Sequence, residues 1–476
     1  MNQRDMPGSA FRALDQLPPA FDPPDLAERV KAAVAASGRK LVALDDDPTG
    51  VQTVYDTPVL ARWDVDDLVR ELRDPWPVCF LLTNSRGLPE ERARRVNQEI
   101  ATALLASSVE TGREFVVASR SDSTLRGHFP AETDTLTTVL GAIDGVLLVP
   151  AFFEGGRFTI DDTHLVQIGD QLVPAAETEF ARDPTFGYRS SNLRAWIAEK
   201  SAGRISAAEV GSIGLDDIRR GGPTRVTELL LDVHGGSVGV VNAAGYADLA
   251  VVVLGLLAAE ARGKRFVYRT AASFVRVRAG LDDRPLLTRE ELLGVSAPVG
   301  PGLVVVGSHV QRSSQQLDSL LALTEVDGIE LEVAPILAGH MEMAAIAAEK
   351  ATASLAADRT AVLFTSREVV VESGDQLQIS AIVSAALVAA VRAIRVEPRF
   401  IIGKGGITSS DIGTKALDAR RAVVLGQIRP GVPVWRLGPE ARYPGLPYIV
   451  FPGNVGEITT LAEIVSELRG STAFTA

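Results

Sequence analysis

The sequence predicts an α/β protein of two domains, each with a largely parallel sheet flanked by helices. Short apolar runs alternate with amphipathic stretches along most of the chain, which is typical of parallel strands joined by helices. The chain has 476 residues, which is too long for one ordinary core. The proline- and glycine-rich stretch 296–302 interrupts the alternation and is the best linker candidate.

Each element follows from a local pattern. We expect strands at the apolar runs 41–44, 78–82, 115–118, 146–149, 238–241, 266–268, 303–306, 361–364, 400–402, 422–425 and 448–451. A helix begins near Pro89, since proline fits the first helical turn. We therefore expect a loose leader at 1–25, a first domain at 26–290 and a second domain at 296–476.

Composition excludes several classes of protein. The net charge of −12 argues against a general nucleic-acid or anionic-membrane surface, so neither partner is expected. Cys79 is the single cysteine, which excludes internal disulfides and cysteine-cluster metal sites and indicates a reducing compartment. No apolar stretch predicts a membrane span, and the N-terminal residues do not resemble a signal peptide. We expect a cytoplasmic protein.

Two glycine-rich loops near the C-terminus suggest a nucleotide site. The first runs from Gly403 to Ser410 and the second from Gly453 to Glu457, and each lies between a predicted strand and a predicted helix. Such a junction concentrates backbone N–H donors, which suits phosphate. Neither loop has the P-loop or dinucleotide-binding spacing. Each on its own is also compatible with a simple turn.

An acidic turn follows the first predicted strand. Asp45, Asp46 and Asp47 are consecutive and precede Pro48-Thr49-Gly50. Three adjacent carboxylates repel one another unless cations or hydrogen bonds compensate. They can hold Mg²⁺, act as a base or bind sugar hydroxyls, and the structural alternative is an acidic helix cap.

A second polar loop, 119–128, follows the strand at 115–118. Its hydroxyls, its carboxylate Asp122 and its guanidiniums at Arg120 and Arg126 suit a polyhydroxy anion, because arginine can grip a carboxylate with two hydrogen bonds. The structural alternative is a capped, solvated turn.

Two more loops contain candidate residues. After the strand at 146–149, Arg157 and His164 can neutralise an anion or order a hydroxyl, although an isolated histidine is as often structural. The stretch 177–184 is a candidate lid or a plain loop. Ser308, after the strand at 303–306, can meet a phosphate or simply cap a helix.

Taken in order, these motifs resemble the four-carbon acid sugar kinase family, formerly a domain of unknown function. The resemblance rests on six motifs from about 41 to 468: Asp46-Asp47-Pro48-Thr49-Gly50, Asp122-Ser123-Thr124-Leu125-Arg126-Gly127, Pro150-Ala151-Phe152 with Gly156-Arg157, Gly307-Ser308, Gly405-Gly406-Ile407-Thr408-Ser409 and Gly453-Asn454-Val455-Gly456. Each motif alone is unspecific, but their order is specific.

The resemblance implies an N-terminal domain that binds a sugar acid such as threonate or erythronate, and a C-terminal domain that binds ATP. The expected reaction transfers the γ-phosphate to the terminal hydroxyl of the acid. Mg²⁺ would bridge ATP oxygens, and its protein ligands stay unknown. A homodimer is the family-level expectation.

The residue roles follow from that hypothesis. Asp46 or Asp122 would orient and deprotonate the hydroxyl, and the sequence does not choose between them. The expected substrate-binding residues are Asp47, Ser123, Thr124, Arg126, Gly127, Arg157 and His164. The expected ATP-binding residues are Ser308, Lys404, Gly405, Gly406, Thr408, Ser409, Gly453, Asn454 and Gly456.

Two alternatives stay open. The pattern Asp45-Asp46-Asp47-Pro48-Thr49 also fits a phosphatase of the haloacid dehalogenase type, with Asp45 as nucleophile and Asp47 as general acid. Such enzymes usually use a downstream lysine, and none occurs between Lys40 and Lys200. The other alternative is a non-catalytic sensor that binds the sugar acid and the nucleotide.

Overall fold

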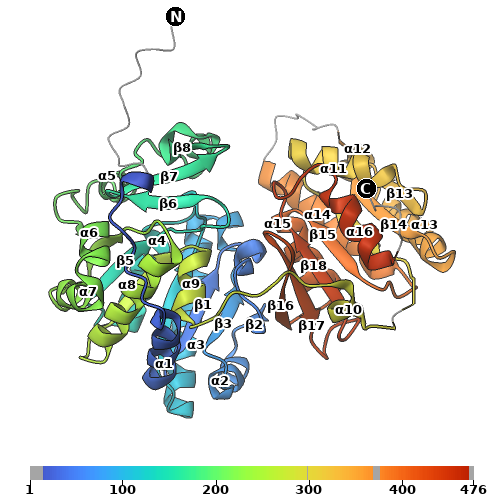
Figure 1. Cartoon of the computed structure of the whole chain (residues 1–476). Helices are drawn as coiled ribbons and strands as arrows, with labels where there is room; N and C mark the ends of the chain where they lie inside the picture. The colour runs from blue at the N-terminus through green and yellow to red at the C-terminus, as the bar shows by residue number, and fades with distance from the viewer. Residues whose placement is uncertain (1–13, 297, 368–375, 471–476) are drawn as a thin grey trace, which may run out of the picture. The chain divides into compact units, whose positions relative to one another are not determined.

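The computed structural model describes residues 14–296, 298–367 and 376–470, which form two compact units (Figure 1). The first unit takes its described residues from Met1–Asp46, Trp63–Cys79 and Ser85–Asp282. The second takes them from Asp47–Arg62, Phe80–Asn84 and Asp283–Ala476. Two short segments from the first part of the sequence therefore belong to the second unit.

A parallel sheet forms the centre of the first unit. Its strands are β1 (Lys40–Asp45), β4 (Phe115–Arg120), β11 (Phe266–Thr270), β5 (Gly145–Val149), β10 (Ser237–Val241) and β9 (Gly211–Ile213), in that spatial order. Asp45 is aligned with Arg120, and Thr270 is aligned with both Arg120 and Val149. These four strand ends therefore lie along one edge of the sheet.

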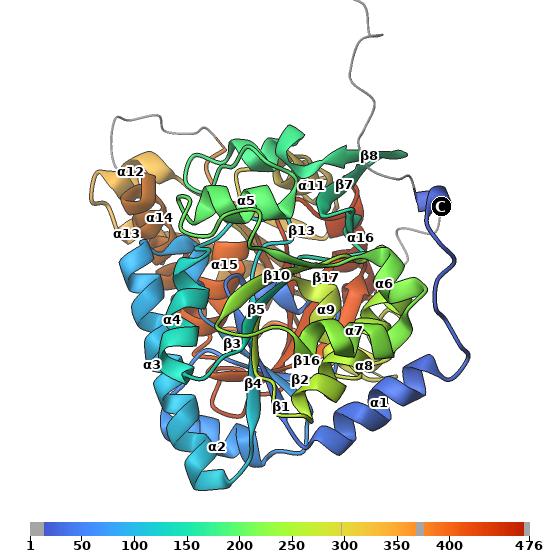
Figure 2. The same ribbon diagram turned by 90° about the vertical axis from the view of Figure 1, so that its left-hand side faces the viewer.

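Helices cover both faces of this sheet. Figure 2 shows α2 (Val65–Arg73), α3 (Glu90–Thr111) and α4 (Ala131–Leu140) on one side of the strands, and α1 (Leu26–Ser37), α6 (Leu215–Arg219), α7 (Gly222–Leu231) and α8 (Tyr246–Glu260) on the other. The helix α9 (Ala272–Arg278) packs against α8 and α1, and α5 (Leu193–Lys200) follows a small second sheet. Strands buried on both faces explain why the runs are continuously apolar.

The small second sheet is antiparallel and was not predicted. It contains β6 (Arg157–Ile160), β7 (Thr163–Ile168) and β8 (Gln171–Pro174). Asp161 and Asp162 join β6 to β7 with φ values of 50° and 59°. Positive φ at both central residues is the signature of a tight hairpin turn. These two carboxylate residues form a turn, in a segment whose polar composition conceals its strands.

The second unit combines a parallel and an antiparallel part. Parallel strands lie in the order β13 (Val326–Leu331), β14 (Thr360–Thr365), β12 (Leu303–Val306), β15 (Ile401–Lys404) and β18 (Pro447–Phe451). The antiparallel strands β17 (Val432–Leu437), β16 (Arg421–Arg429) and β2 (Thr57–Leu60) follow, and β2 pairs in parallel with Phe80 and Leu81 of β3 (Val78–Leu82). The predicted parallel architecture is confirmed for both units, apart from this antiparallel part.

A proline–glycine turn explains the exception. Only Pro430 and Gly431 separate β16 from β17, and Gly431 has a φ of 78°. A two-residue connection can only reverse the chain into a hairpin, because a parallel crossover needs about a dozen residues. The run at 422–425 is therefore a strand, as predicted, but it runs antiparallel to β17.

The remaining helices of the second unit fall into two packed groups. The group α10 (Arg289–Leu293), α11 (Gln311–Leu321) and α16 (Thr460–Arg469) is held together by contacts to α16. The other group contains α12 (Val333–Leu337), α13 (Glu342–Ala356), α14 (Gln376–Ala393) and α15 (Gly406–Asp411), followed by a π-helical turn at Ile412–Ala416.

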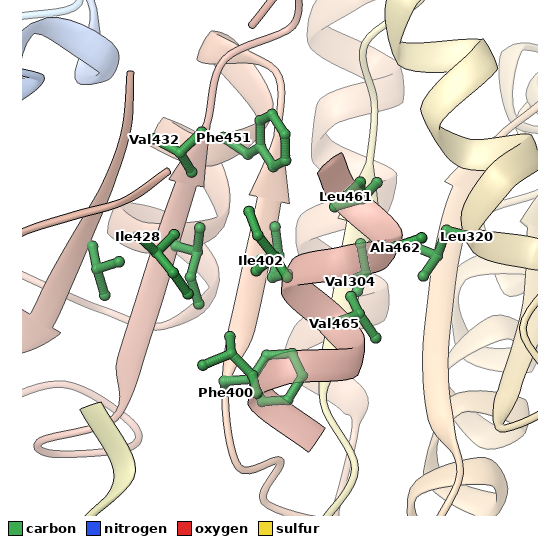
Figure 3. Close-up of a cluster of buried hydrophobic side chains, with 14 of the residues drawn as sticks. Val304, Leu320, Phe400, Ile402, Ile428, Val432, Phe451, Leu461, Ala462 and Val465 are labelled. Carbon is green, nitrogen blue, oxygen red and sulfur yellow. The ribbon is translucent and has the colours of Figure 1, made fainter. Parts of the chain in front are cut away.

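A buried apolar cluster fixes the strands that precede the glycine loops. Figure 3 shows Val304, Ile402 and Phe451 from β12, β15 and β18 beside Leu461 and Val465 of α16. All five are at most 1 % exposed. A close-packed interior of this kind has low compressibility, so the loops at the ends of these strands have rigid bases.

Two predicted connecting segments lie partly outside the described residues. Of the leader 1–25, residues 1–13 are not described, whereas Pro18 accepts a hydrogen bond from Arg219 at 2.6 Å and Phe21 packs against Gly222. Of the linker 296–302, Ala297 is not described. Within the described ranges, every helix is too short or too polar to cross a membrane.

Candidate functional site

Parallel strand ends gather the predicted polar residues of the first unit. Asp46 follows β1, the loop with Asp122 and Arg126 follows β4, and the loop that leads to Arg157 follows β5. Because these strands lie in the order β1-β4-β11-β5, their loops leave from the same sheet edge. This edge is where ligands bind in open parallel sheets.

The three consecutive aspartates have different partners. Asp45 is 1 % exposed, and its Oδ1 lies 3.3 Å from Nη1 of Arg120. Asp46 pairs with Arg86 instead. Asp47 belongs to the second unit, where its Oδ1 accepts hydrogen bonds from the N–H and hydroxyl of Thr49 at 2.8 and 2.6 Å. Separate partners remove the repulsion that the sequence pattern implies.

Arg86 links the two candidate bases. Its Nη2 and Nε donate to Oδ1 and Oδ2 of Asp46 at 2.5 and 3.2 Å, a two-point contact to a carboxylate that is 4 % exposed. Its Nη1 lies 3.8 Å from Oδ1 of Asp122. Sequence analysis did not single out Arg86, although it lies four residues after a predicted strand, where a charged residue is a usable signal.

Asp122 organises its own loop. Its carboxylate accepts hydrogen bonds from Nε and Nη2 of Arg126 at 2.8 and 3.3 Å, and from the hydroxyl of Thr124. Burial by itself raises the pKa of Asp122, but the charges of Arg86 and Arg126 and these hydrogen bonds outweigh burial and hold the pKa far below its usual range. Asp122 is therefore a carboxylate at neutral pH and a weak proton acceptor.

Arg126 and Arg157 lie over one aromatic ring. Their guanidinium carbons are 5.3 and 5.7 Å from the ring centroid of Phe180, in the stretch considered as a lid. Arg126 is also 3.7 Å from Asp183. Among the described residues, no carboxylate forms an ion pair with Arg157, and its buried Nε has no hydrogen-bond partner. Arg157 is thus a cation whose charge is available to an anion.

His164 is fully buried and bound on both ring nitrogens. Its Nε2 donates to the carbonyl of Ser123 at 2.7 Å, and its Nδ1 accepts from the hydroxyl of Thr159 at 3.1 Å. Burial lowers the pKa of His164 to about 4. At neutral pH the ring is therefore uncharged, and in this structure it holds the backbone of the 122–127 loop.

Further charged residues of this edge were missed by sequence analysis. Glu132 on α4 is 3 % exposed and accepts from Ser85 and Asn97 at 2.5 and 3.4 Å. Burial, followed by the charge of Asp46, raises the pKa of Glu132. Arg269 lies within the apolar strand β11 and is 3 % exposed. Arg269 directly follows the predicted run 266–268, and a charged residue at that position is the signal that was available.

In the second unit, three loops after adjacent parallel strands converge. They follow β12, β15 and β18 and contain Ser308, Gly405 and Gly453. A Cβ atom at Gly405 would lie 2.8 Å from Cβ of Ser308, and one at Gly453 would lie 2.9 Å from Oγ of Ser308. Both glycines are therefore needed for the close approach of the loops.

Lys404 joins two of these loops from inside. Its side chain is 0 % exposed, and Nζ donates to the carbonyls of Pro452 and Gly453 at 2.5 and 3.2 Å. Nζ also lies 3.9 Å from the ring centroid of Phe451. Burial, together with the charge of Arg312, lowers the pKa of Lys404 to about 7. In this structure Lys404 supports the backbone of the second glycine loop.

The other predicted residues of the second unit differ in exposure. Thr408 is 8 % exposed, and a Cβ atom at Gly307 would lie 2.3 Å from its hydroxyl. Ser409 is 0 % exposed, and its hydroxyl donates to the carbonyl of Gly403 at 2.6 Å. Asn454 and Gly456 are exposed. The loop that contains them is fixed by Gln316, whose side chain donates to the carbonyls of Val455 and Glu457 at 3.0 and 2.7 Å.

Two early segments of the chain touch the helix after the first glycine loop. A Cβ atom at Gly406 would lie 3.0 Å from Oδ2 of Asp47. The side chain of Asn84 donates from Nδ2 to the hydroxyl of Ser410 at 2.6 Å. Asp47 therefore lies beside Gly406 within the second unit. Among the described residues, no group of three or more histidine, cysteine, aspartate or glutamate side chains is arranged to hold a metal ion.

Known protein families match both halves of the chain. Residues 41–278 match the family model of a sugar-binding N-terminal domain, and residues 303–461 match that of a nucleotide-binding C-terminal domain. A protein named D-erythronate kinase from Heliobacterium modesticaldum is 29 % identical over 225 residues, which cover 45 % of this chain and 47 % of that protein. The chain thus spans about half the length of this curated relative.

Solved structures support the same fold. A Salmonella typhimurium LT2 protein, described provisionally as a tRNA synthase, aligns with a TM-score of 0.65 at 18 % identity and covers 89 % of this chain and 98 % of its own. A Haemophilus influenzae protein assigned to a family of unknown function (DUF1537) aligns with a TM-score of 0.59 at 18 % identity, covering 89 % and 99 %. The resemblance inferred from the six ordered motifs is confirmed, and the chain belongs to the four-carbon acid sugar kinase family.

Proposed function

We propose that the protein is an ATP-dependent kinase that phosphorylates the terminal hydroxyl of a four-carbon sugar acid related to threonate or erythronate. The observation that supports this most is the charge balance of the first unit. There, Arg157 has no carboxylate partner among the described residues and lies beside Arg126 over Phe180. A sugar acid supplies both the missing carboxylate and hydroxyls for the surrounding polar groups.

Within this proposal the residues of the first unit have different roles. Arg157 and Arg126 bind the substrate carboxylate, while Ser123, Thr124 and Gly127 form the loop that presents Arg126. Asp46 orients the attacking hydroxyl and accepts its proton. The strongly lowered pKa of Asp122 favours Asp46 over Asp122 in that role and leaves Asp122 to position Arg126.

In the second unit, the converging loops hold the nucleotide. Backbone N–H groups that follow Gly405, beginning with Gly406, and those around Gly453 face the phosphates, with Ser308 and Thr408 as hydroxyl donors and with Asn454 and Gly456 at the exposed rim. The N–H of Gly405 itself donates to the carbonyl of Phe451 at 2.8 Å. Lys404 and Ser409 shape this site from within. Phosphoryl transfer mainly requires such positioning and charge neutralisation.

Mg²⁺ fits this site as an ion that arrives on ATP. Magnesium keeps several waters and needs few protein ligands, so the lack of a ready cluster among the described residues is compatible with it. Asp47, beside Gly406, is the carboxylate that would hold it from the protein side. When bound, the ion neutralises phosphate charge.

The direct test is a coupled ADP-release assay with a panel of four-carbon sugar acids, including D-erythronate and the threonates. ADP formation that depends on one acid supports the proposal, and its absence with every four-carbon acid and their longer homologues rejects it. Calorimetric binding of acid and nucleotide without turnover would instead indicate the sensor.

The phosphatase alternative is less compatible with the geometry. Its nucleophile would be Asp45, which is buried and paired with Arg120. Release of inorganic phosphate from sugar phosphates, abolished by Asp45→Asn but not by Asp46→Asn, would favour that alternative over the kinase.

A further inference from the structure

Arg269 is a buried cation that none of the roles above uses. It is the fourth residue of β11, aligned with Ser119 of β4 and Leu148 of β5, and only 3 % of it is exposed. Burial of a guanidinium is costly unless charges and hydrogen bonds compensate it. The cost of burying the Arg269 guanidinium must therefore be offset by its surroundings.

The other buried arginines of the first unit have a plain structural reason. Arg278 pairs with Glu260 at 2.7 Å, and Arg120 pairs with Asp45 at 3.3 Å. Arg269 differs from both. Among the described residues it has no ion pair within 4 Å, and its buried Nε has no hydrogen-bond partner. Its Nη2 donates to the backbone carbonyl of Arg126 at 2.9 Å.

Carboxylates of the candidate site act on this cation electrostatically, although none among the described residues forms an ion pair with it within 4 Å. Burial lowers the pKa of Arg269, and the charges of Asp46, Glu132 and Asp122 counteract that effect in this order. The charge is therefore shared among several acids of the site. An arginine that served only to close one structural ion pair would show a single short contact.

Gly127 shows how closely these groups pack. Its φ is 117°, and a Cβ atom there would lie 3.2 Å from Oδ2 of Asp46 and 3.3 Å from Nη2 of Arg269. Asp46, Arg269 and the 126–127 backbone thus lie side by side. Arg269 contacts the turn that carries Arg126 and lies next to the carboxylate of Asp46.

We propose that Arg269 is a positioning residue of the sugar-acid site, which holds the Arg126–Gly127 turn and the Asp46 carboxylate in one arrangement. This inference rests on the proposed function. Arg269 acts through Arg126 on the binding of the acid and through Asp46 on the orientation of the hydroxyl. Its loss should therefore affect both kcat and the KM for the acid, and leave the KM for ATP unchanged.

The test compares Arg269→Lys and Arg269→Gln with Arg278→Lys. The control residue is 1 % exposed, and its Nε also lacks a partner, but it pairs with Glu260. We expect Arg269→Lys to lower kcat/KM for the acid about tenfold and Arg269→Gln about a hundredfold, each with the KM for ATP within about twofold of the wild type. Arg278→Lys should lower the thermal midpoint without changing kcat/KM.

Two results would overturn the inference. One is a kcat/KM for the acid within about twofold of wild type in both folded Arg269 variants. The other is a loss that only parallels unfolding, as in Arg278→Lys. If the wild type binds an acid without forming ADP, the kinase proposal fails, and calorimetric affinity for that acid replaces kcat/KM in the same comparison. If the wild type binds none of the acids, both proposals fail.

Discussion

The buried ammonium of Lys404 donates a hydrogen bond to the carbonyl of Gly453 and so connects the glycine loops after β15 and β18. The two loops are 49 positions apart in sequence. Each glycine loop by itself is compatible with a simple turn. The contact shows that the two loops are held together. It also makes the protonation of one buried lysine relevant to stability.

Lys404 should make the stability of the fold increase with pH. Burial lowers its pKa to about 7, below the value of the unfolded chain, so the unfolded state binds more protons between pH 7 and about 10.5. Stability should therefore rise across this window. Urea unfolding at pH 7 and pH 9 should show a larger gain for the wild type than for Lys404→Met. An equal gain in both proteins contradicts the assignment.

His164 should weaken the fold in acid. Burial lowers its pKa to about 4, below that of an unfolded histidine, so its contribution is present above about pH 6.5 and is lost as the pH falls towards 4. The His164→Gln variant should lack this loss of stability between about pH 6.5 and pH 4. Thermal midpoints measured from pH 7 to pH 4.5 provide the check, and an unchanged slope for the variant would rule the histidine out as its source.

Replacement of Arg157 should weaken binding of the sugar acid selectively. Arg157→Gln removes a cation that has no carboxylate partner among the described residues, so we expect the KM for the acid to rise at least about tenfold, with little change in the KM for ATP. Arg189→Gln is the control, since the Arg189 side chain is 91 % exposed. Steady-state kinetics with each substrate varied separately decide the matter, and a rise in the KM for ATP alone would refute the assignment.

Gly453→Ala should disturb the nucleotide half. The added Cβ would meet Oγ of Ser308 at 2.9 Å and Cγ2 of Val310 at 3.3 Å. Either Ser308 gives up its hydrogen bond with Ser313 or the loops separate, at a cost of about 1–3 kcal/mol. We expect a higher KM for ATP and an unchanged KM for the acid. Gly245→Ala, where nothing lies within 4 Å of the added atom, is the control. Unaltered ATP kinetics in Gly453→Ala would remove this loop from the proposed site.

Asp46→Asn and Asp122→Asn should differ in kind. If Asp46 accepts the proton, Asp46→Asn lowers kcat by about 10²–10⁴-fold with little effect on the KM for the acid. Asp122→Asn removes the carboxylate that holds Arg126, so the KM for the acid should rise first. Measuring kcat and KM of both variants on the same panel of sugar acids separates these roles. If Asp122→Asn mainly lowers kcat and Asp46→Asn mainly raises KM, the two roles are exchanged.

Local sequence patterns were sufficient for the main architecture. The predicted runs at 41–44, 115–118 and 303–306 all lie in parallel strands, because strands buried on both faces must be continuously apolar. The apolar-run pattern did not predict the two hairpins. The β6–β7 turn at Asp161 and Asp162 and the β16–β17 turn at Pro430 and Gly431 are short local reversals, and their strands have weaker patterns.

The candidate site was predictable where residues follow strands in sequence. Asp46, Asp122 and Arg157 lie at loops of the same sheet edge because parallel strands direct their carboxyl ends together. Arg86 and Arg269 were missed, since their relevance depends on contacts to residues 40 and 143 positions away. Asp47 was grouped with Asp46 because the two are adjacent in sequence; Asp47 belongs to the second unit, and its role in substrate binding stays a prediction.

The sequence by itself determined the continuously apolar strands, the glycines that allow loops to approach closely, and the family to which the chain belongs. Each of these depends on residues near one another in the chain or on the order of short motifs. Only the tertiary structure decided which distant partner each of these charged groups has: Arg120 for Asp45, Arg86 for Asp46 and no carboxylate within 4 Å, among the described residues, for Arg269. The reason is physical, because a buried charge is stabilised by whatever the fold brings within a few ångströms, and that set includes residues far away in the sequence.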